Sequence, residues 1–236
     1  MVMAKKVLVI SDMQIPYQHK DAIDFLKAVK KKYKPDHVVN IGDTVDNYCL
    51  SAWVKSPEAE SANEEIKSML ADVNKLGKIF PKMDVLQGNH CKRIERAAVR
   101  AGIPMHFIKD YGEWMGAPKG WKFHPFEFEL DGIIYSHGDE QGAGGQNASL
   151  KRAMHYGKSS VAGHLHTQAN INYFANRETL LFGMQVGCLI DRKAIAFAYA
   201  KNSLKKPVLT VGMIDNGNPL LIPMRLDQDG NWTKKL

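Results

Sequence analysis

The sequence has little cysteine, no long apolar run and no low-complexity segment, and each absence excludes a class of protein. Three cysteines among 236 residues, with no CxxC spacing, exclude a disulfide-stapled scaffold and a thiolate zinc finger. The longest apolar-rich stretch, residues 179–190, is interrupted by Gly183, Gln185 and Gly187. It is far shorter than the ~20 residues that a membrane span needs. A hydrophobic fraction of 44% excludes a disordered chain.

The start of the chain lacks the apolar core of a secretory signal. Only four apolar residues, 7–10, separate the segment MVMAKK from Ser11. Together with the sparse cysteines, this predicts a cytoplasmic protein in a reducing compartment, with no membrane partner. The length predicts one domain, residues 1–236, that buries a sizeable core, and the oligomeric state stays open.

Positive charge is in excess. The chain has 32 Lys and Arg against 25 Asp and Glu, a net charge of +7 at pH 7, and a pI of about 9.2. This excess favours an anionic partner such as nucleic acid or phosphate, but it carries no information about the fold.

The first half of the chain alternates short apolar strands with amphipathic helices. The predicted strands cover residues 6–10, 37–41 and 83–86, and the predicted helices cover 21–32, 61–80 and 93–100. Ser61 and Glu64 have the spacing of a capping box at the start of the second helix. The alternation predicts parallel strands joined by right-handed crossovers.

The second half is richer in strands, so the predicted fold class is α/β with a β-rich second half. The strand-like runs cover residues 126–130, 133–135, 160–162, 171–174, 180–186, 194–199, 208–214 and 220–224, and one helix is predicted over 148–156. Residues 102–120 are predicted to form a surface insertion, and the glycine-rich residues 137–145 a mobile connection.

Polar residues that bind metals follow several of the predicted strands. They stand in the segments Asp12-Met13-Gln14, Gly42-Asp43-Thr44-Val45-Asp46, Gly88-Asn89-His90, Ser136-His137-Gly138 and Gly163-His164-Leu165-His166. Functional sites of open α/β sheets lie outside the carboxyl ends of the strands. We therefore expect the five segments to meet at one edge of the sheet.

These segments offer carboxylate, amide and imidazole ligands and no thiolate, a set that suits Mn, Fe, Zn or Co. Asp43 can bridge two cations because a carboxylate has two oxygens. Two cations about 3.5–4 Å apart clamp a phosphate and activate water. Gly42, Gly88 and Gly163 would let the backbone turn sharply where the strands end.

In this order, the motifs DxQ, GDxxD, GNH, SHG and GHxH resemble those of the calcineurin-like metallophosphoesterase superfamily, including its compact phage and bacterial enzymes. The motifs run from residue 12 to residue 166, and the last third of the chain resembles the family only in being β-rich. The resemblance implies a four-layer αββα sandwich and a hydrolase that acts on phosphoester bonds.

The resemblance also implies a dinuclear metal site, in which an activated hydroxide attacks phosphorus. One metal would be held by Asp12, Gln14, Asp43 and His166, and the other by Asp43, Asn89, His137 and His164. Two divalent ions are expected, Mn first, with Fe, Zn, Co, Ni or Mg as alternatives.

Two further residues would act on the leaving group. In the family, the histidine of GNH protonates the leaving oxygen, and here that role falls on His90. The second aspartate of GDxxD, Asp46, would orient this imidazole, and its negative charge would favour the protonated form. Arg93 and Arg96 follow closely and are candidates for gripping the substrate, although a solvated helix face explains them equally well.

The chain departs from the family pattern at three positions, one of which is Cys91, because the residue after GNH is often acidic in the family. The family usually has DxH where this chain has Gln14, and an amide oxygen is a weaker donor that favours harder ions such as Mn or Mg. A structural role for Gln14, and its replacement as a ligand by His19, stay open. The protein-phosphatase branch has Arg after GDxxD, and Asn47 at that position disfavours a phosphoprotein phosphatase.

The main functional hypothesis is a phosphodiesterase or nuclease acting on nucleotides or nucleic acid. The alternatives are a phosphomonoesterase acting on small nucleotides or phosphosugars, and a non-catalytic interaction scaffold of the same fold, as in the retromer subunit. Trp53, Trp114 and Trp121 could stack on bases, but packing is their expected role.

The densest lysine run, residues 30–34, lies at the end of the first predicted helix, which runs away from the expected site. These lysines should therefore sit at the opposite edge of the sheet. The positive charge that meets phosphate is accordingly expected to come from metal ions rather than from lysine.

Overall fold

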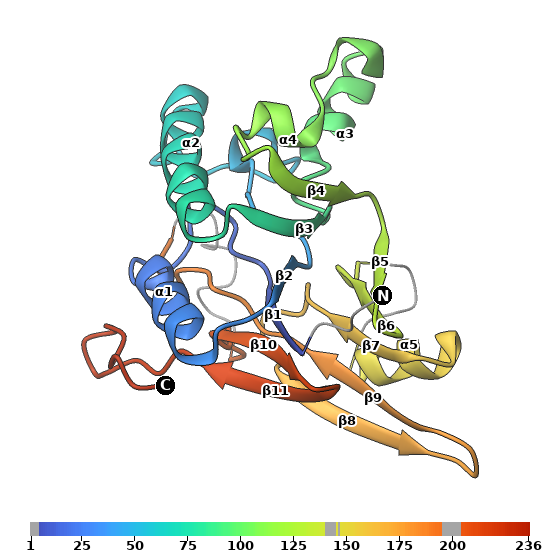
Figure 1. Cartoon of the computed structure of the whole chain (residues 1–236). Coiled ribbons are helices and arrows are strands. Elements are labelled where there is room, and N and C mark those ends of the chain that lie inside the picture. Colours follow the sequence, from blue (N-terminus) through green and yellow to red (C-terminus); the bar gives the residue numbers. More distant parts are fainter. Residues whose placement is uncertain (1–4, 140–144, 146, 195–203) are drawn as a thin grey trace.

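The computed structural model describes residues 5–139, 145, 147–194 and 204–236. Two β-sheets pack face to face, and helices cover the outer face of each, so the layers follow the order α-β-β-α (Figure 1). This arrangement confirms the predicted sandwich. None of the helices within these described ranges is long and apolar enough to cross a membrane.

The first sheet has six strands in the order β11-β10-β1-β2-β3-β4. Its strands are β1 (Lys6–Ile10), β2 (His37–Asn40), β3 (Lys82–Leu86), β4 (Gly120–His124), β10 (Thr210–Asp215) and β11 (Asn218–Pro223). β1 to β4 run parallel, as the β-α alternation predicts, whereas β10 and β11 add antiparallel pairs at one side.

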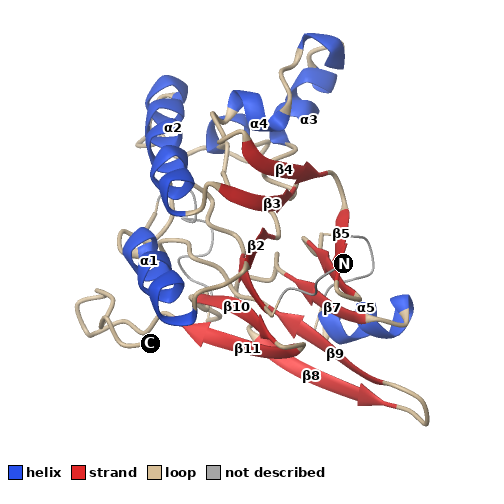
Figure 2. Cartoon of the chain, in the orientation of Figure 1, coloured by secondary structure: helices blue, strands red, loops and turns tan. Residues whose placement is uncertain are grey.

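The second sheet has five strands in the order β5-β6-β7-β9-β8 (Figure 2). Its strands are β5 (Glu127–Leu130), β6 (Ile133–Ser136), β7 (Ser159–Ala162), β8 (Asn170–Ala175) and β9 (Leu180–Gln185). β6, β7 and β9 are parallel to one another, and β5 and β8 close the two sides as antiparallel strands.

Helices α1 (Ala22–Tyr33) and α2 (Ala62–Ile79) cover the outer face of the first sheet because each carries an apolar stripe. The apolar side chains of both stripes pack against inward-facing strand residues in one hydrophobic core. α5 (Ala148–Tyr156) packs against β7 and β9 on the other side of the sandwich. α3 (Arg93–Arg100) and the short α4 (Tyr111–Trp114) lie beyond β3 and β4 (Figure 1).

β1 shows how one short strand belongs to both cores. Leu8 and Ile10 face the helices, whereas Val7 and Val9 face the second sheet. Side chains alternate between the faces of a strand, so a strand buried on both faces is continuously apolar. This explains why the predicted strand is an unbroken apolar run.

The predicted elements of the first half are confirmed within two residues at each end, and Ser61 and Glu64 form the predicted capping box. The prediction for residues 102–120 is confirmed for the largely exposed residues 102–110 and wrong for the rest. This segment contains a 3-10 turn and α4, and it buries Tyr111 and Met115 in the core before Gly120 begins β4. Its glycine and proline content suggested a loop, whereas core packing orders it. Most of residues 194–199, and residues 140–144 of the glycine-rich connection, lie outside the described residues.

The lysine run lies where the sequence places it. Lys34 caps α1, and the backbone N–H of Asp36 donates to the carbonyl oxygen of Lys6, where β1 starts. This is the edge of the sheet opposite to the carboxyl ends of the strands, where the polar motifs stand.

Candidate active site

The polar motifs come together at the carboxyl ends of strands from both sheets. Asp12, Asp43 and Asn89 follow β1, β2 and β3 of the first sheet, whereas His137 and His164 follow β6 and β7 of the second. The expected meeting at one edge therefore involves the corresponding edges of two packed sheets.

Four residues of the polar motifs have a left-handed backbone conformation, which non-glycine residues seldom adopt. The φ angles are 47° at Asp12, 49° at Gln14, 47° at Asp43 and 68° at His164. Each such residue costs of order 1–3 kcal/mol, and strain of this kind clusters at functional sites. Hydrogen bonds between the first two motifs hold the strained turns, from Asp12 N–H to the carbonyl of Gly42 at 3.2 Å and from Gln14 N–H to that of Asp43 at 2.9 Å.

Asp12, Gln14 and His166 form the first group of potential metal ligands. His166 Nε2 lies 2.9 Å from Asp12 Oδ1 and 3.2 Å from Gln14 Nε2. Gln14 Oε1 is buried and has no hydrogen-bond partner within the described part of the chain. An unpaired buried polar atom is costly, and a cation at this oxygen would remove that cost.

Asn89, His137 and His164 form the second group. Asn89 Oδ1 lies 3.0 Å from His137 Nε2 and 3.0 Å from His164 Nδ1. His137 Nδ1 lies 3.0 Å from the carbonyl oxygen of Ile41. This contact fixes the orientation of the ring and leaves Nε2 as the nitrogen that could bind a metal.

Asp43 lies between the two groups. One ligand atom from each of Asp12, Asp43 and His137 lies within 4.8 Å of the others. Asp43 Oδ1 accepts the backbone N–H of His90 at 2.8 Å, whereas the buried Oδ2 has no hydrogen-bond partner among the described residues and lies 3.2 Å from His137 Nε2. Asp43 therefore lies close to members of both groups.

The charges of this cluster favour cations. Burial raises the pKa of Asp12 and Asp43, but the neighbouring imidazoles outweigh burial and lower the pKa of both carboxyl groups. Burial lowers the pKa of His137, but the charge of Asp43 outweighs burial and raises that pKa to about 10. The two carboxylates therefore attract positive charge. A divalent cation would neutralise them more strongly than protons on the neighbouring imidazoles do.

The donor set fits two divalent cations, since it combines two carboxylates, two side-chain amides and three imidazoles around the unpaired oxygens. The alternative ligand His19 is engaged elsewhere. Its Nε2 lies 3.0 Å from the carbonyl oxygen of Gly230, and its Nδ1 accepts the N–H of Asp21 at 3.1 Å. Gln14 is therefore the residue that the first motif presents to the cluster.

The glycines of the motifs have two different roles. Gly42 has a φ of +106°, and a Cβ there would lie 2.6 Å from His137 Nδ1. Gly88 and Gly163 lack a positive φ, so the turns that follow them do not depend on the conformational freedom of glycine. A Cβ would instead lie 2.1 Å from Asp43 Oδ1 at Gly88 and 2.0 Å from Ser11 Oγ at Gly163. These two glycines let strand ends from different motifs approach closely.

His90, the predicted general acid, stands beside this cluster and contacts two aspartates. Its Nδ1 lies 3.0 Å from Asp46 Oδ2, and its Nε2 lies 4.0 Å from Asp43 Oδ2. Asp46 is buried, and its other oxygen accepts Arg93 Nη1 at 2.5 Å. Arg93 Nη2 lies 3.4 Å from His90 Nε2.

The two arginines predicted to grip the substrate differ in their surroundings. Arg93 is paired with Asp46, which neutralises its charge, so its first role is to hold Asp46 and His90 in place. Arg96 is exposed and donates to the backbone carbonyl oxygen of Asn89. Because a carbonyl carries no net charge, Arg96 keeps its positive charge beside the ligand cluster.

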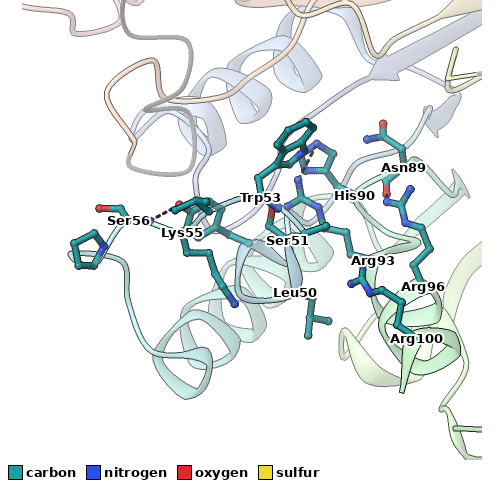
Figure 3. Close-up of a pocket in the computed structure, with 14 residues that line it drawn as sticks. Leu50, Ser51, Trp53, Lys55, Ser56, Asn89, His90, Arg93, Arg96 and Arg100 are labelled. Atoms are coloured by element: carbon teal, nitrogen blue, oxygen red, sulfur yellow. Dashed lines mark hydrogen bonds between the residues drawn. The ribbon is translucent and has the colours of Figure 1, made fainter. Parts of the chain in front are cut away.

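A groove of about 970 Å³ opens from His90 and Asn89 (Figure 3). One wall is formed by the segment from Tyr48 to Pro57, and the other by the face of α3 that carries Arg93, Arg96 and Arg100. Among the described residues, Asn89 is the member of the ligand cluster that lines this groove, and the groove is large enough for an extended substrate.

The tryptophans divide between core and surface. Trp121 is buried and donates to the carbonyl oxygen of Phe80 at 2.7 Å, and Trp114 packs against the core, so packing is confirmed for both. The expected packing is wrong for Trp53, whose side chain stands at the groove and is 83% exposed.

Sequence reasoning missed Arg100 and the wall formed by residues 48–57. A signal for Arg100 exists, because positions 93, 96 and 100 have the spacing of one helix face. No local signal exists for the wall. Its position depends on Glu65 of α2, which accepts the N–H groups of Tyr48 at 2.6 Å and Cys49 at 2.8 Å.

The chain is similar to two curated phage proteins. It is 26% identical to the Gene 54 protein of Mycobacterium phage L5 over 217 residues, which cover 81% of this chain and 82% of that protein. It is 28% identical to the Gene 54 protein of Mycobacterium phage D29 over 216 residues, with the same coverage.

Solved structures show partial similarity. Vps29 of Chaetomium thermophilum aligns with 98% of this chain and 94% of its own, at 14% identity and a TM-score of 0.48. The phosphoesterase Yfce of E. coli aligns with 97% of this chain and 96% of its own, at 14% identity and a TM-score of 0.43. The nuclease MPE of Pseudomonas putida aligns with 92% of this chain and 87% of its own, at 11% identity and a TM-score of 0.39.

The family model for calcineurin-like phosphoesterases matches residues 5–173, which include all five motifs. Enzymes of this family are hydrolases that use divalent metals, generally in a dinuclear site, and the ligand cluster described above fits that chemistry. The chain belongs to the calcineurin-like phosphoesterase family.

Proposed function

We propose that this hydrolase is a phosphodiesterase or nuclease that acts on nucleotides or nucleic acid. The observation that carries the proposal is the open groove of about 970 Å³, which is lined by His90 and by the arginines of α3. A diester has a substituent on both sides of phosphorus, and an open groove leaves room for the second one.

The roles of the site residues follow from their contacts. Divalent cations held by the two ligand groups would neutralise phosphate charge and supply the nucleophile. Asp46 accepts Nδ1–H of His90, so Nε2 is the ring nitrogen that would give a proton to the leaving oxygen when the imidazole is protonated on both nitrogens. Arg93 holds Asp46 through the other carboxylate oxygen and steadies that orientation.

Asn47 also fits a diesterase. It occupies the position where the protein-phosphatase branch carries an arginine, and its Nδ2 donates to the backbone carbonyl of His90 at 3.4 Å. Its side chain therefore supports the acid instead of offering a positive charge to a phosphate dianion. We propose Mn as the native metal, since Gln14 adds an oxygen donor where the family pattern has an imidazole.

Hydrolysis of bis-p-nitrophenyl phosphate tests this function directly. The protein is treated with a chelator and then given Mn, Zn, Co, Ni or Mg in separate reactions. We expect turnover that depends on the added metal and exceeds turnover of mono-p-nitrophenyl phosphate. Asp43→Asn, which removes the carboxylate shared by both groups, is the matched control and should be inactive.

A preference for the monoester would replace this proposal with the phosphomonoesterase alternative. A folded protein that retains no metal and hydrolyses neither compound would instead favour the interaction scaffold. Elemental analysis after growth in Mn-supplemented medium separates a metal-free scaffold from an enzyme that needs another substrate.

A further inference from the structure

The groove beside His90 has two walls that differ in chemistry (Figure 3). The wall from Tyr48 to Pro57 presents the side chains of Trp53 and Val54, which are 83% and 98% exposed. The facing wall is the arginine side of α3. Large apolar side chains that face water beside a catalytic group indicate a surface used for binding.

The charge of the groove is positive. Arg93, Arg96, Arg100 and Lys55 line it, and no acidic side chain of the described residues does. Arg93 is neutralised by Asp46, but neither Arg96 nor Arg100 pairs with a carboxylate anywhere in the described structure. These two residues lie four apart on one helix face, about 6 Å along its axis. The groove therefore offers a short row of uncompensated charges to a polyanion.

Trp53 narrows the choice of polyanion. Its ring stands at the same end of the groove as His90. An exposed indole next to a row of arginines is the combination that binds single-stranded nucleic acid, since an unpaired base stacks on the ring while phosphates meet the cations. An acidic peptide would use the arginines but would leave the ring without a flat partner, and the bases of a duplex are already stacked.

We infer that the groove binds single-stranded nucleic acid on the leaving-group side of the scissile phosphate, with one base on Trp53 and the following phosphates on Arg96 and Arg100. The side is assigned by His90, because the group that receives its proton is the leaving group and the groove opens from that residue. This inference rests on the proposed diesterase function and adds to it the strandedness and the position of the substrate.

Binding of a fluorescein-labelled octathymidylate tests the inference by fluorescence anisotropy. All proteins carry His90→Asn and are loaded with Mn, so that the strand stays intact. We expect Trp53→Ala to weaken binding about 10-fold, the loss of one stacked base, and Trp53→Phe to restore part of it. Arg100→Ala should lower the slope of log affinity against log salt by about 0.7, the value of one single-strand phosphate contact.

Lys31→Ala is the matched control, since Lys31 lies at the opposite edge of the sheet and should change neither quantity. Unchanged affinity in Trp53→Ala together with an unchanged salt slope in Arg100→Ala would overturn the inference. Binding of polyglutamate or of a duplex with equal affinity and the same Trp53 dependence would overturn it too. The proposed function fails separately, when wild-type protein does not hydrolyse bis-p-nitrophenyl phosphate with any metal.

Discussion

Asp46 Oδ2 lies 3.0 Å from Nδ1 of His90, and this contact leaves the second ring nitrogen of His90 facing Asp43. The same carboxylate binds Arg93, so the imidazole of His90, the carboxylate of Asp46 and the guanidinium of Arg93 form one chain of contacts. Asp46 is almost fully buried, which keeps solvent from competing for these contacts.

His90→Ala should lose turnover while retaining metal. General acid catalysis contributes about 10²–10⁴-fold, and it matters most for leaving groups that are poor without protonation. We therefore expect the loss to be large for alkyl and nucleoside esters and small for p-nitrophenyl esters. Steady-state kinetics on a series of leaving groups, with metal content from elemental analysis, measures this. An equal loss on good and poor leaving groups would contradict the acid role.

Gln14 should contribute directly to metal affinity. Its Oε1 is the unpaired buried oxygen of the first ligand group, so Gln14→Ala should weaken metal binding about 10-fold or more. Gln14→His adds an imidazole at this position and should tighten zinc relative to manganese. Competition against a chromogenic chelator gives both affinities. If Gln14→Ala binds metal as tightly as the wild type, the side chain only shapes the cluster.

Gly42→Ala should damage the metal centre through His137. The new Cβ would lie 2.6 Å from His137 Nδ1 and would disturb the contact of that nitrogen with the carbonyl of Ile41. A positive φ adds strain of order 1–3 kcal/mol. We expect lower metal affinity and a lower melting temperature. Gly132→Ala is the control, because Gly132 also has a positive φ but nothing within 4 Å of its Cβ position, so it should lower stability alone.

Asp84 should contribute to stability in a pH-dependent way. It is buried on β3 and joins two neighbouring strands, with Oδ2 2.7 Å from His37 Nε2 and Oδ1 2.7 Å from His124 Nε2. Burial raises its pKa, but the hydrogen bonds from these imidazoles outweigh burial and lower the net pKa. A carboxyl group with a lowered native pKa stabilises the fold above its unfolded pKa of about 3.9, and this contribution is lost as the pH falls through the native pKa.

Asp84→Asn should therefore reduce the free energy of unfolding at pH 7 by about 1–2 kcal/mol, given that solvent screens both partly exposed imidazoles. The difference from the wild type should shrink below about pH 4. Urea denaturation between pH 3 and pH 8 measures it. Asp24→Asn, which removes an exposed carboxylate paired with Lys27, should show no such pH-dependent difference. A difference that stays constant down to pH 3 would contradict the assignment.

Much of the fold and of the ligand cluster could be predicted from the sequence. The apolar run of β1 and the stripes of α1 and α2 follow from local periodicity, because burial selects side chains at fixed intervals along strands and helices. The ligand residues could be predicted because they directly follow strands, and parallel strands bring such residues to one edge. By contrast, β4 was missed, since its pairing with β3 arises from packing that no local pattern records.

The sequence by itself determined which chemical groups are available and that they follow strand ends. Only the tertiary structure decided which of these groups contact one another. It pairs Arg93 with Asp46, brings Gly88 and Gly163 close to side chains of other motifs, and leaves the Trp53 side chain exposed at the groove that Arg100 also lines. The physical reason is that these contacts join segments far apart in the chain. They depend on how two sheets and α3 pack in space, whereas periodicity describes only neighbours along the sequence.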